Sequence, residues 1–198
     1  MTIFKNINQE EPYIIFQNMY DDAVKAGQKE IEAIVISSYC KDNSEVNSRF
    51  VNLKFIQNEE FIFFSNYESP KARHFEKHSQ ITALIYWNRI NTQIRMKAEI
   101  KKTSLDFNNK YFKNRSPEKN ALAISSRQSE KIKSYDEVLK KYEQSLKNDD
   151  LSLCPNYWGG FTFAPYYFEF WQGHDLRINS RLVFKKHNDG WKKSIIQP

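Results

Sequence analysis

The stretch WGGFTFAPYYFEFWQG, residues 158–173, opens on two adjacent glycines and is dominated by aromatic side chains. Aromatic and β-branched residues favour extended chain, so we predict one strand over residues 159–165 and another over 166–173. Two further strands are predicted to follow, over residues 181–186 and 190–196. This part of the chain therefore reads as consecutive antiparallel strands.

The preceding residues contain further strand patterns with helices between them. Strands are predicted over residues 31–40, 48–56, 60–66, 80–88 and 92–103. Helices are predicted over residues 12–27, 69–78, 105–115 and 134–147. Ser69 and Ser104 are predicted to be N-caps, and Pro12 and Pro70 occupy first helical positions. The order favours an α+β, mainly β barrel with peripheral helices rather than a parallel sheet.

Length and composition favour a single domain. The chain has 198 residues, of which 40% are hydrophobic, enough for one core. No apolar run has the length of a membrane span, and the first residues lack a signal-peptide pattern, so we expect a soluble cytoplasmic protein. Cys40 and Cys154 are expected to be free thiols.

The charge pattern does not single out a nucleic-acid partner. The formal net charge is +6, but the basic residues are interleaved with acidic ones, and no RNA-binding or zinc-finger signature occurs. His74 and His78 have the i, i+4 spacing of a zinc pair, yet no third ligand accompanies them, so no metal site is predicted. A positive surplus also suits small phosphorylated ligands.

A phosphate site in this chain would depend on side chains. Only 5 glycines are present, and no glycine-rich phosphate loop or nucleophile elbow occurs. Clusters of hydroxyl, amide and cationic groups occur instead at four places, namely Arg49 with Lys54, Ser65 with Ser69 and Lys71, Tyr111 with Arg115, and residues 126–129. Taken singly, each is also explained by a half-buried strand, a helix cap, a surface pair or a polar loop.

Taken together, these clusters have the order of a known family. The segments RFVNLK (49–54), FFSNYESPKA (63–72), KYFKNR (110–115), SSRQS (125–129), YWGGF (157–161), FEFWQG (168–173) and GWKKSIIQP (190–198) resemble the pyridoxamine 5′-phosphate oxidase family. The resemblance implies an FMN-binding split β-barrel, antiparallel and Greek-key-like. It implies one domain over residues 1–198, with a dimerisation and substrate region at about 155–198, and a homodimer with FMN at the interface.

The resemblance also implies roles for individual residues. FMN would be bound by Arg49, Phe50, Val51, Asn52, Leu53, Lys54, Phe64, Ser65, Lys71, Gln93, Gln128, Ser129, Trp171 and Arg181. The substrate phosphate would be held by Lys54, Tyr111, Arg115 and Lys119, while Arg177 would lie over the substrate ring beside Asn179. Arg177 and Asn179 would be the catalytic pair. In an extended chain, Arg177, Asn179 and Arg181 would share one face.

The implied reaction is the oxidation of pyridoxamine or pyridoxine 5′-phosphate to pyridoxal 5′-phosphate, with O₂ reduced to H₂O₂. Several positions depart from the family pattern. Asn179 replaces a histidine, and Asn cannot carry a proton near neutral pH. Thr92 and Pro70 replace flavin-site arginines, Lys119 replaces a serine, and the N-terminal arm is short.

These departures leave two other functions open. One is a related split-barrel FMN enzyme that acts on a different small molecule, for example in secondary metabolism. The other is a non-enzymatic protein, either a flavin or pyridoxal-phosphate carrier or, on net charge alone, a nucleic-acid-binding protein.

Overall fold

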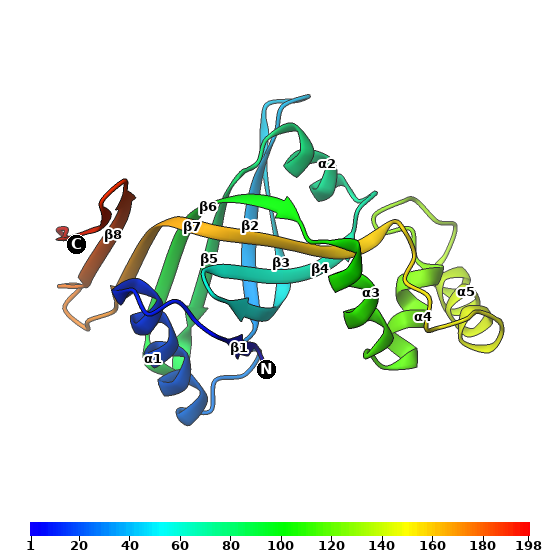
Figure 1. The fold of residues 1–198 in the computed structure, drawn as a ribbon, viewed down its shortest axis with the longest axis horizontal. Coiled ribbons are helices and arrows are strands. Elements are labelled where there is room, and N and C mark those ends of the chain that lie inside the picture. The colour runs from blue at the N-terminus through cyan, green and yellow to red at the C-terminus, as the bar shows by residue number, and fades with distance from the viewer.

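The computed structural model describes residues 1–198 and contains one nine-stranded sheet with five α-helices around it (Figure 1). The strands are β1 (Ile3–Lys5), β2 (Ala33–Cys40), β3 (Glu45–Gln57), β4 (Glu60–Asn66), β5 (Gln80–Trp87), β6 (Thr92–Lys102), β7 (Trp158–Gln172), β8 (Ser180–His187) and β9 (Gly190–Ile195). The helices are α1 (Glu11–Lys25), α2 (Pro70–Lys77), α3 (Leu105–Lys113), α4 (Pro117–Ser125) and α5 (Tyr135–Asn148), with a 3₁₀ turn, η1 (Asn88–Ile90).

Six strands close into an antiparallel barrel. Pairing runs from β3 through β2, β5, β6 and β7 to β4, which pairs back onto β3. The short β1 adds to β3 in parallel, and β8 and β9 extend the sheet outside the barrel. The predicted α+β, mainly β barrel with peripheral helices is confirmed.

One strand, β7, joins the barrel to its extension. Its residues 158–163 pair with β4, whereas residues 167–172 pair with β8. The predicted break between residues 165 and 166 is therefore wrong. Pro165 is accommodated because the register with β6 shifts there, between Lys97 and Ala98, which is where a strand tolerates a residue without an N–H.

Two elements were not predicted from the sequence. The strand β1 is only three residues long, too short to show alternation. The helix α4 begins with Pro117 at its first turn, but only Asn120 and Ala121 are buried, so its apolar face is weak. None of the helices has the length and apolarity needed to cross a membrane.

The core is rich in aromatic residues, which make up 12 of its 26 buried side chains, and α1 packs against it. Tyr13, Phe16 and Tyr20 of α1 are buried and contact rings of the barrel strands, such as Phe61 and Trp87. Edge-to-face ring pairs of this kind add to the free energy gained by burying apolar surface. Figure 1 shows α3, α4 and α5 at one end of the molecule and β8 with the C-terminus at the other.

Candidate functional site

A cleft of about 450 Å³ lies between the barrel and the helices α2, α3 and α4. Its lining residues come from β3, the end of β4, the start of α2, the α3–α4 region, the loop after α4 and the start of β7. The lining residues are Phe50, Val51, Asn52, Lys54, Phe64, Ser65, Lys71, Tyr111, Arg115, Lys119, Gln128 and Trp158. The four polar clusters found in the sequence thus each contribute to one cleft, although Lys54 and Gln128 are 74 positions apart in the chain.

Lys71 is the most buried cation of the cleft, with 8% of its surface exposed. Its Nζ donates to Ser65 Oγ (2.9 Å), Ser69 Oγ (3.1 Å) and Gln128 Oε1 (2.9 Å), and no carboxylate pairs with it. Burial, together with the charge of Arg49, lowers the pKa of the Lys71 amine to about 8. A buried ammonium surrounded only by neutral oxygens is suited to an anionic ligand.

Ser69 was predicted to cap α2, and the structure gives its side chain a different contact. It does stand at the N-cap position, but its hydroxyl donates to Asn66 O (2.7 Å) and accepts from Lys71 rather than capping a helical N–H. Ser104, in contrast, caps α3 as predicted, accepting from the Phe107 N–H (3.3 Å).

Arg49 lies beside this cluster, and hydrogen bonds to β2 hold its guanidinium in place. Its Nη1 donates to Ile36 O (3.0 Å) and to Ser38 Oγ (2.8 Å), and Ser38 Oγ also contacts His74 Nδ1 (3.2 Å). Burial lowers the pKa of the Arg49 guanidinium, which has no acidic partner either. His74 therefore bonds a serine within this network.

Aromatic rings form the wall on the α3 side. Tyr111 stacks on Phe64 with ring centroids 3.9 Å apart, and Phe64 stacks in turn on Trp158 at 5.1 Å. The Arg115 guanidinium lies 4.4 Å from the centre of the Trp158 ring, in cation–π contact. One of its nitrogens, Nη1, is buried without a hydrogen-bond partner, so this arginine retains a free donor.

The strand β3 alternates as the sequence predicts. Phe50, Asn52 and Lys54 lie on one face, with Phe50 74% exposed, while Leu53 on the other face is 2% exposed and packs in the core. The Leu53 side chain therefore does not line the cleft. Lys54 makes a half-exposed ion pair with Glu32 (3.6 Å), and Lys119 lies at the solvent-facing rim.

Trp158 was not among the predicted site residues. The two glycines that follow it hold the cleft wall in place, because a Cβ at Gly159 would lie 2.2 Å from Tyr67 Oη and one at Gly160 would lie 2.5 Å from Thr103 Oγ1. The buried Asn108 of α3 accepts from the Gly160 N–H (2.8 Å). An aromatic residue directly before a glycine pair was the available signal for this site.

A second group of predicted residues lies elsewhere. Gln93, Trp171 and Arg181 are direct cross-strand neighbours on β6, β7 and β8, so they share one face of the sheet extension. Trp158 and Trp171 are at opposite ends of β7, roughly 40 Å apart for an extended strand. One chain therefore does not bring the two groups together. Next to Gln93 and Trp171, Thr92 Oγ1 donates to Gln172 Oε1 (2.6 Å).

The expectation that Arg177, Asn179 and Arg181 share one strand face is wrong. The strand β8 begins at Ser180, and residues 173–179 form a loop in which Arg177 has a φ of 61°. Asn179 Oδ1 accepts the His174 backbone N–H (3.0 Å), which closes the loop. Because Arg177 has a left-handed backbone conformation, the side chains of residues 177–181 do not alternate between two faces as they would in an extended strand.

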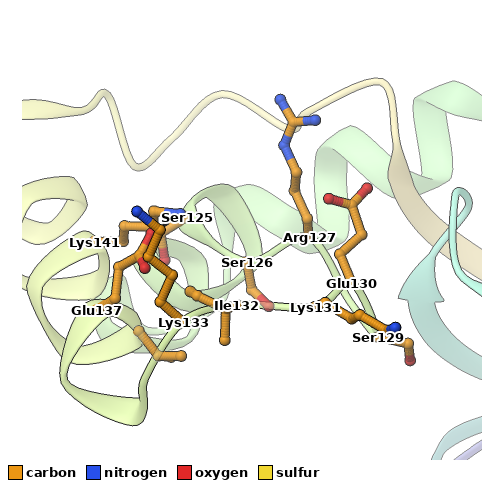
Figure 2. Close-up of a pocket in the computed structure, with 11 residues that line it drawn as sticks. Ser125, Ser126, Arg127, Ser129, Glu130, Lys131, Ile132, Lys133, Glu137 and Lys141 are labelled. Carbon is orange, nitrogen blue, oxygen red and sulfur yellow. Dashed lines mark ion pairs between the residues drawn. The ribbon is translucent and has the colours of Figure 1, made fainter.

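The last predicted contact, Ser129, lines a different cavity, of about 780 Å³, between the end of α4 and α5 (Figure 2). Its walls are mostly polar or charged, including Arg127, Lys133 and Glu137. Ser129 is exposed and has a φ of 71°. The neighbouring Gln128 points instead to Lys71, so the loop separates these two adjacent residues.

Comparisons with known proteins identify the family. The family model for the pyridoxine 5′-phosphate oxidase C-terminal dimerisation region matches residues 158–198. A pyridoxine/pyridoxamine 5′-phosphate oxidase of Colwellia psychrerythraea is 34% identical over 191 residues, covering 94% of this chain and 87% of that protein. The chain belongs to the pyridoxine/pyridoxamine 5′-phosphate oxidase family. A family member of the same name from Leptospira interrogans is 31% identical, covering 95% of this chain and 89% of its own.

Solved structures extend the likeness of this oxidase-family chain to the fold. PhzG from Burkholderia lata, solved in complex with tetrahydrophenazine-1-carboxylic acid, aligns with a TM-score of 0.89 at 22% identity, covering 95% of this chain and 93% of that one. A pyridoxamine 5′-phosphate oxidase-related, FMN-binding protein from Nostoc punctiforme aligns with a TM-score of 0.78 at 12% identity, covering 92% and 97% of the two chains. At these identities the agreement concerns the fold.

Proposed function

We propose that this protein is an FMN-dependent oxidase that converts pyridoxamine or pyridoxine 5′-phosphate to pyridoxal 5′-phosphate. The observation that carries the proposal is the cleft, where the lining residues include Lys54, Lys71 and Arg115 but no carboxylate, and where the charge of Arg49 acts on Lys71. Membership of the oxidase family supports the reaction type, since relatives covering most of the chain carry that name.

The donors of the cleft suit the phosphate of FMN. Lys71 with Ser65 would hold it, with Arg49 supported by Ser38 beside them, and Gln128 would add an amide from the loop. The exposed Phe50 and the neighbouring Val51 and Asn52 would contact the flavin, as would Phe64. When bound, FMN would supply the redox chemistry, accepting the hydride that leaves the substrate and passing two electrons to O₂ to form H₂O₂.

A second phosphate would bind at the opposite wall. Tyr111 and Arg115 converge there from α3 and the residues following it, and Lys54 and Lys119 complete the group. The free Nη1 of Arg115 and the planar guanidinium suit a phosphate better than a lysine would. Pocket geometry of this kind favours a small phosphorylated substrate over a nucleic acid.

The complete site would need two copies of the chain. The row of Gln93, Trp171 and Arg181 crosses β6, β7 and β8 at the end of β7 that is far from the cleft, so it does not reach the cleft of its own chain. In a symmetric dimer each cleft would receive this row from the partner. The matched family region, named for dimerisation, covers β7 and β8, which carry Trp171 and Arg181. Arg177 and Asn179, on the adjoining loop, would then reach the substrate of the partner's cleft, and the whole chain would act as one domain.

A second candidate is a related FMN enzyme that acts on another small molecule. Asn179 favours it, because its side chain closes the 173–179 loop and cannot transfer a proton. The similarity to PhzG concerns the fold and favours neither substrate.

An absorption spectrum separates these functions. Purified protein is expected to be yellow. Anaerobic pyridoxamine 5′-phosphate is expected to bleach the flavin bands as it is oxidised, and air is expected to restore the bands and to allow continued formation of pyridoxal 5′-phosphate. A yellow protein that pyridoxamine 5′-phosphate does not bleach would show that the protein binds a flavin but would exclude the proposed substrate. A colourless protein that does not take up added FMN would exclude both functions.

A further inference from the structure

Glu169 is an acid with no assigned role at the centre of the sheet extension. Its exposed surface is 2%, although it lies on a strand that leaves the barrel. Its Oε1 accepts from Arg181 Nε (2.9 Å) and Nη2 (2.7 Å), and its Oε2 accepts from Tyr167 Oη (2.8 Å) and from Arg95. Four donors from three strands therefore converge on one carboxylate.

The register places this cluster next to the second group of proposed cofactor residues. Arg95 is directly opposite Glu169, two residues along from the pair Gln93 and Trp171, so all four share one face. Arg181 is directly opposite Trp171 on β8. The Glu169 carboxylate thus lies next to the row of Gln93, Trp171 and Arg181 that would meet the cofactor.

Arg181 is held in one orientation but keeps donors for a ligand. Besides the two bonds to Glu169, its Nη1 donates to Gln197 O (3.0 Å). A guanidinium has five N–H donors, so about two remain for a ligand. The cluster also keeps a net positive charge, because two guanidinium groups share one carboxylate.

The protonation state of Glu169 agrees with this arrangement. Burial alone would raise the pKa of the Glu169 carboxyl, but hydrogen bonds from Arg181, Tyr167 and Arg95 outweigh it and hold the pKa below its usual range. The carboxyl is therefore charged at neutral pH, and its bonds to the arginine are charge-assisted.

We propose that Glu169 is a positioning residue, which fixes the guanidinium of Arg181 so that its free donors point at the cofactor in the partner's cleft. The inference rests on the proposed function, because Arg181 is an FMN contact only if that function is correct. Fixing an arginine in advance removes the cost of ordering a flexible side chain when the ligand binds. Glu169 itself does not need to touch FMN.

A double-mutant cycle on FMN affinity tests the inference. The variants are Glu169→Gln, Arg181→Met and the double variant, with Glu60→Gln as a control, since Glu60 makes only a surface ion pair with Lys101. The dissociation constant for FMN is measured by quenching of flavin fluorescence, and thermal melting is followed in parallel. We expect Glu169→Gln to weaken binding about tenfold or more alone, yet to change nothing once Arg181 is Met.

The contrary outcomes are separable. If Glu169→Gln binds FMN as tightly as the unaltered protein, or weakens it equally in both backgrounds, the inference is wrong and the oxidase proposal stands. If the unaltered protein does not bind FMN, both fail. Should Glu169→Gln not fold, Glu169→Asp replaces it, since the charge is kept and only the reach to Arg181 is shortened. The same loss of affinity, absent in the Arg181→Met background, is then expected, and additive losses would overturn the inference.

Discussion

Lys71 is a lysine with 8% of its surface exposed and no acidic partner, which is an unfavourable place for a charge. The residues around it keep their hydrogen bonds without it, because Ser65 donates to Gln128 and Ser69 donates to Asn66. Burial of this charge thus lowers the stability of the protein, while under the proposed function the same charge would bind a phosphate. Two other residues of the proposed site differ in the same respect. Arg115 keeps a buried nitrogen free for a ligand, whereas the Asn179 side chain is used in a hydrogen bond within its own loop.

Replacing Lys71 with Met is expected to stabilise the ligand-free protein at pH 7 by about 1–3 kcal/mol, because the cost of burying the ammonium is removed. The folded pKa of about 8 lies below the ordinary 10.5, so the unfolded chain holds more protons between these values. The free energy of unfolding of the unaltered protein should therefore rise through that window, and the advantage of Met should shrink.

Chemical denaturation at pH 7 and at pH 10 measures this difference, with FMN titration alongside. The same variant is expected to lose FMN affinity by tenfold or more, since a charge-assisted bond is worth about 1.5–3 kcal/mol. Lys77→Met on the same helix is the control, because Lys77 is exposed and pairs with Asp42. Unchanged stability and unchanged affinity would show that Lys71 is neutral in its site and makes no ligand contact.

Arg115→Lys is expected to raise the KM for pyridoxamine 5′-phosphate by about 10- to 100-fold, with a smaller change in kcat. Lysine keeps the charge but loses the planar contact with Trp158 and the paired donors. Steady-state oxygen consumption gives both constants, and Lys113→Arg on the exposed face of α3 is the matched control. A fall in kcat alone would place Arg115 outside the phosphate site.

Asn179→His is expected to raise the rate of pyridoxal 5′-phosphate formation if the protein is a weakened oxidase of the usual substrate. Histidine can carry a proton near neutral pH, and its ring nitrogen can still accept the His174 N–H. Anaerobic flavin reduction in a stopped-flow instrument measures the step, with Asn179→Ala as the control for the lost loop bond. No gain over Asn179 would favour a different substrate.

At the scale of the elements, α3 and β7 are locked by a polar network that leaves no room at two glycines. Asn108 Oδ1 accepts from Thr103 Oγ1 (2.6 Å) and the Gly160 N–H (2.8 Å), and Asn108 Nδ2 donates to Tyr67 Oη (2.9 Å). The network sets how close α3, which carries Tyr111, comes to the strand. The cleft wall therefore depends on the absence of a side chain at Gly160.

Gly160→Ala is expected to cost about 2–4 kcal/mol of stability, because the added Cβ would lie 2.5 Å from Thr103 Oγ1 and 3.2 Å from Phe64 Cε1. Gly27→Ala is the comparison. Its Cβ would meet nothing within 4 Å, so only the cost of a φ of 72°, about 1 kcal/mol, is expected. Urea unfolding of both variants measures the difference, and equal costs would show that packing at β7 is loose.

At the scale of the whole molecule, the two groups of proposed site residues lie at opposite ends of β7, so the proposed site would need a pair of chains. A chain carrying Lys71→Met and a chain carrying Arg181→Met should each fail to form a complete site alone. In a mixed dimer one of the two sites would receive both unaltered groups.

Mixing the two variants after unfolding and refolding together is therefore expected to restore about a quarter of the FMN bound per chain by the unaltered protein, since half of the dimers are mixed and each has one complete site. Flavin absorbance after gel filtration gives the number. Refolding each variant separately is the control. No recovery above the separate variants would mean that each chain builds its site alone.

The sequence by itself determined most of the strands and helices, apart from β1 and α4, and the polar residues of the cleft. Alternation along β3 and the Ser104 cap are local, so they could be predicted, as could the clusters at Lys71 and Tyr111. Trp158 and Glu169 lie in the aromatic stretch 158–173, but what each side chain contacts depends on residues from distant parts of the chain, such as Phe64 for Trp158 and Arg95 for Glu169. The break predicted within β7 is wrong because the strand continues through a register shift, and the shared face predicted for Arg177 and Asn179 is wrong because Arg177 has a left-handed backbone conformation.

Only the tertiary structure decided which clusters meet. Closure of β3 onto β4 and of β4 onto β7 brings Lys54, Lys71 and Trp158 to one cleft, and the same β7 carries Trp171 away from it. The physical reason is that strand pairing over long sequence separations sets these distances, and local propensity contains no information about it.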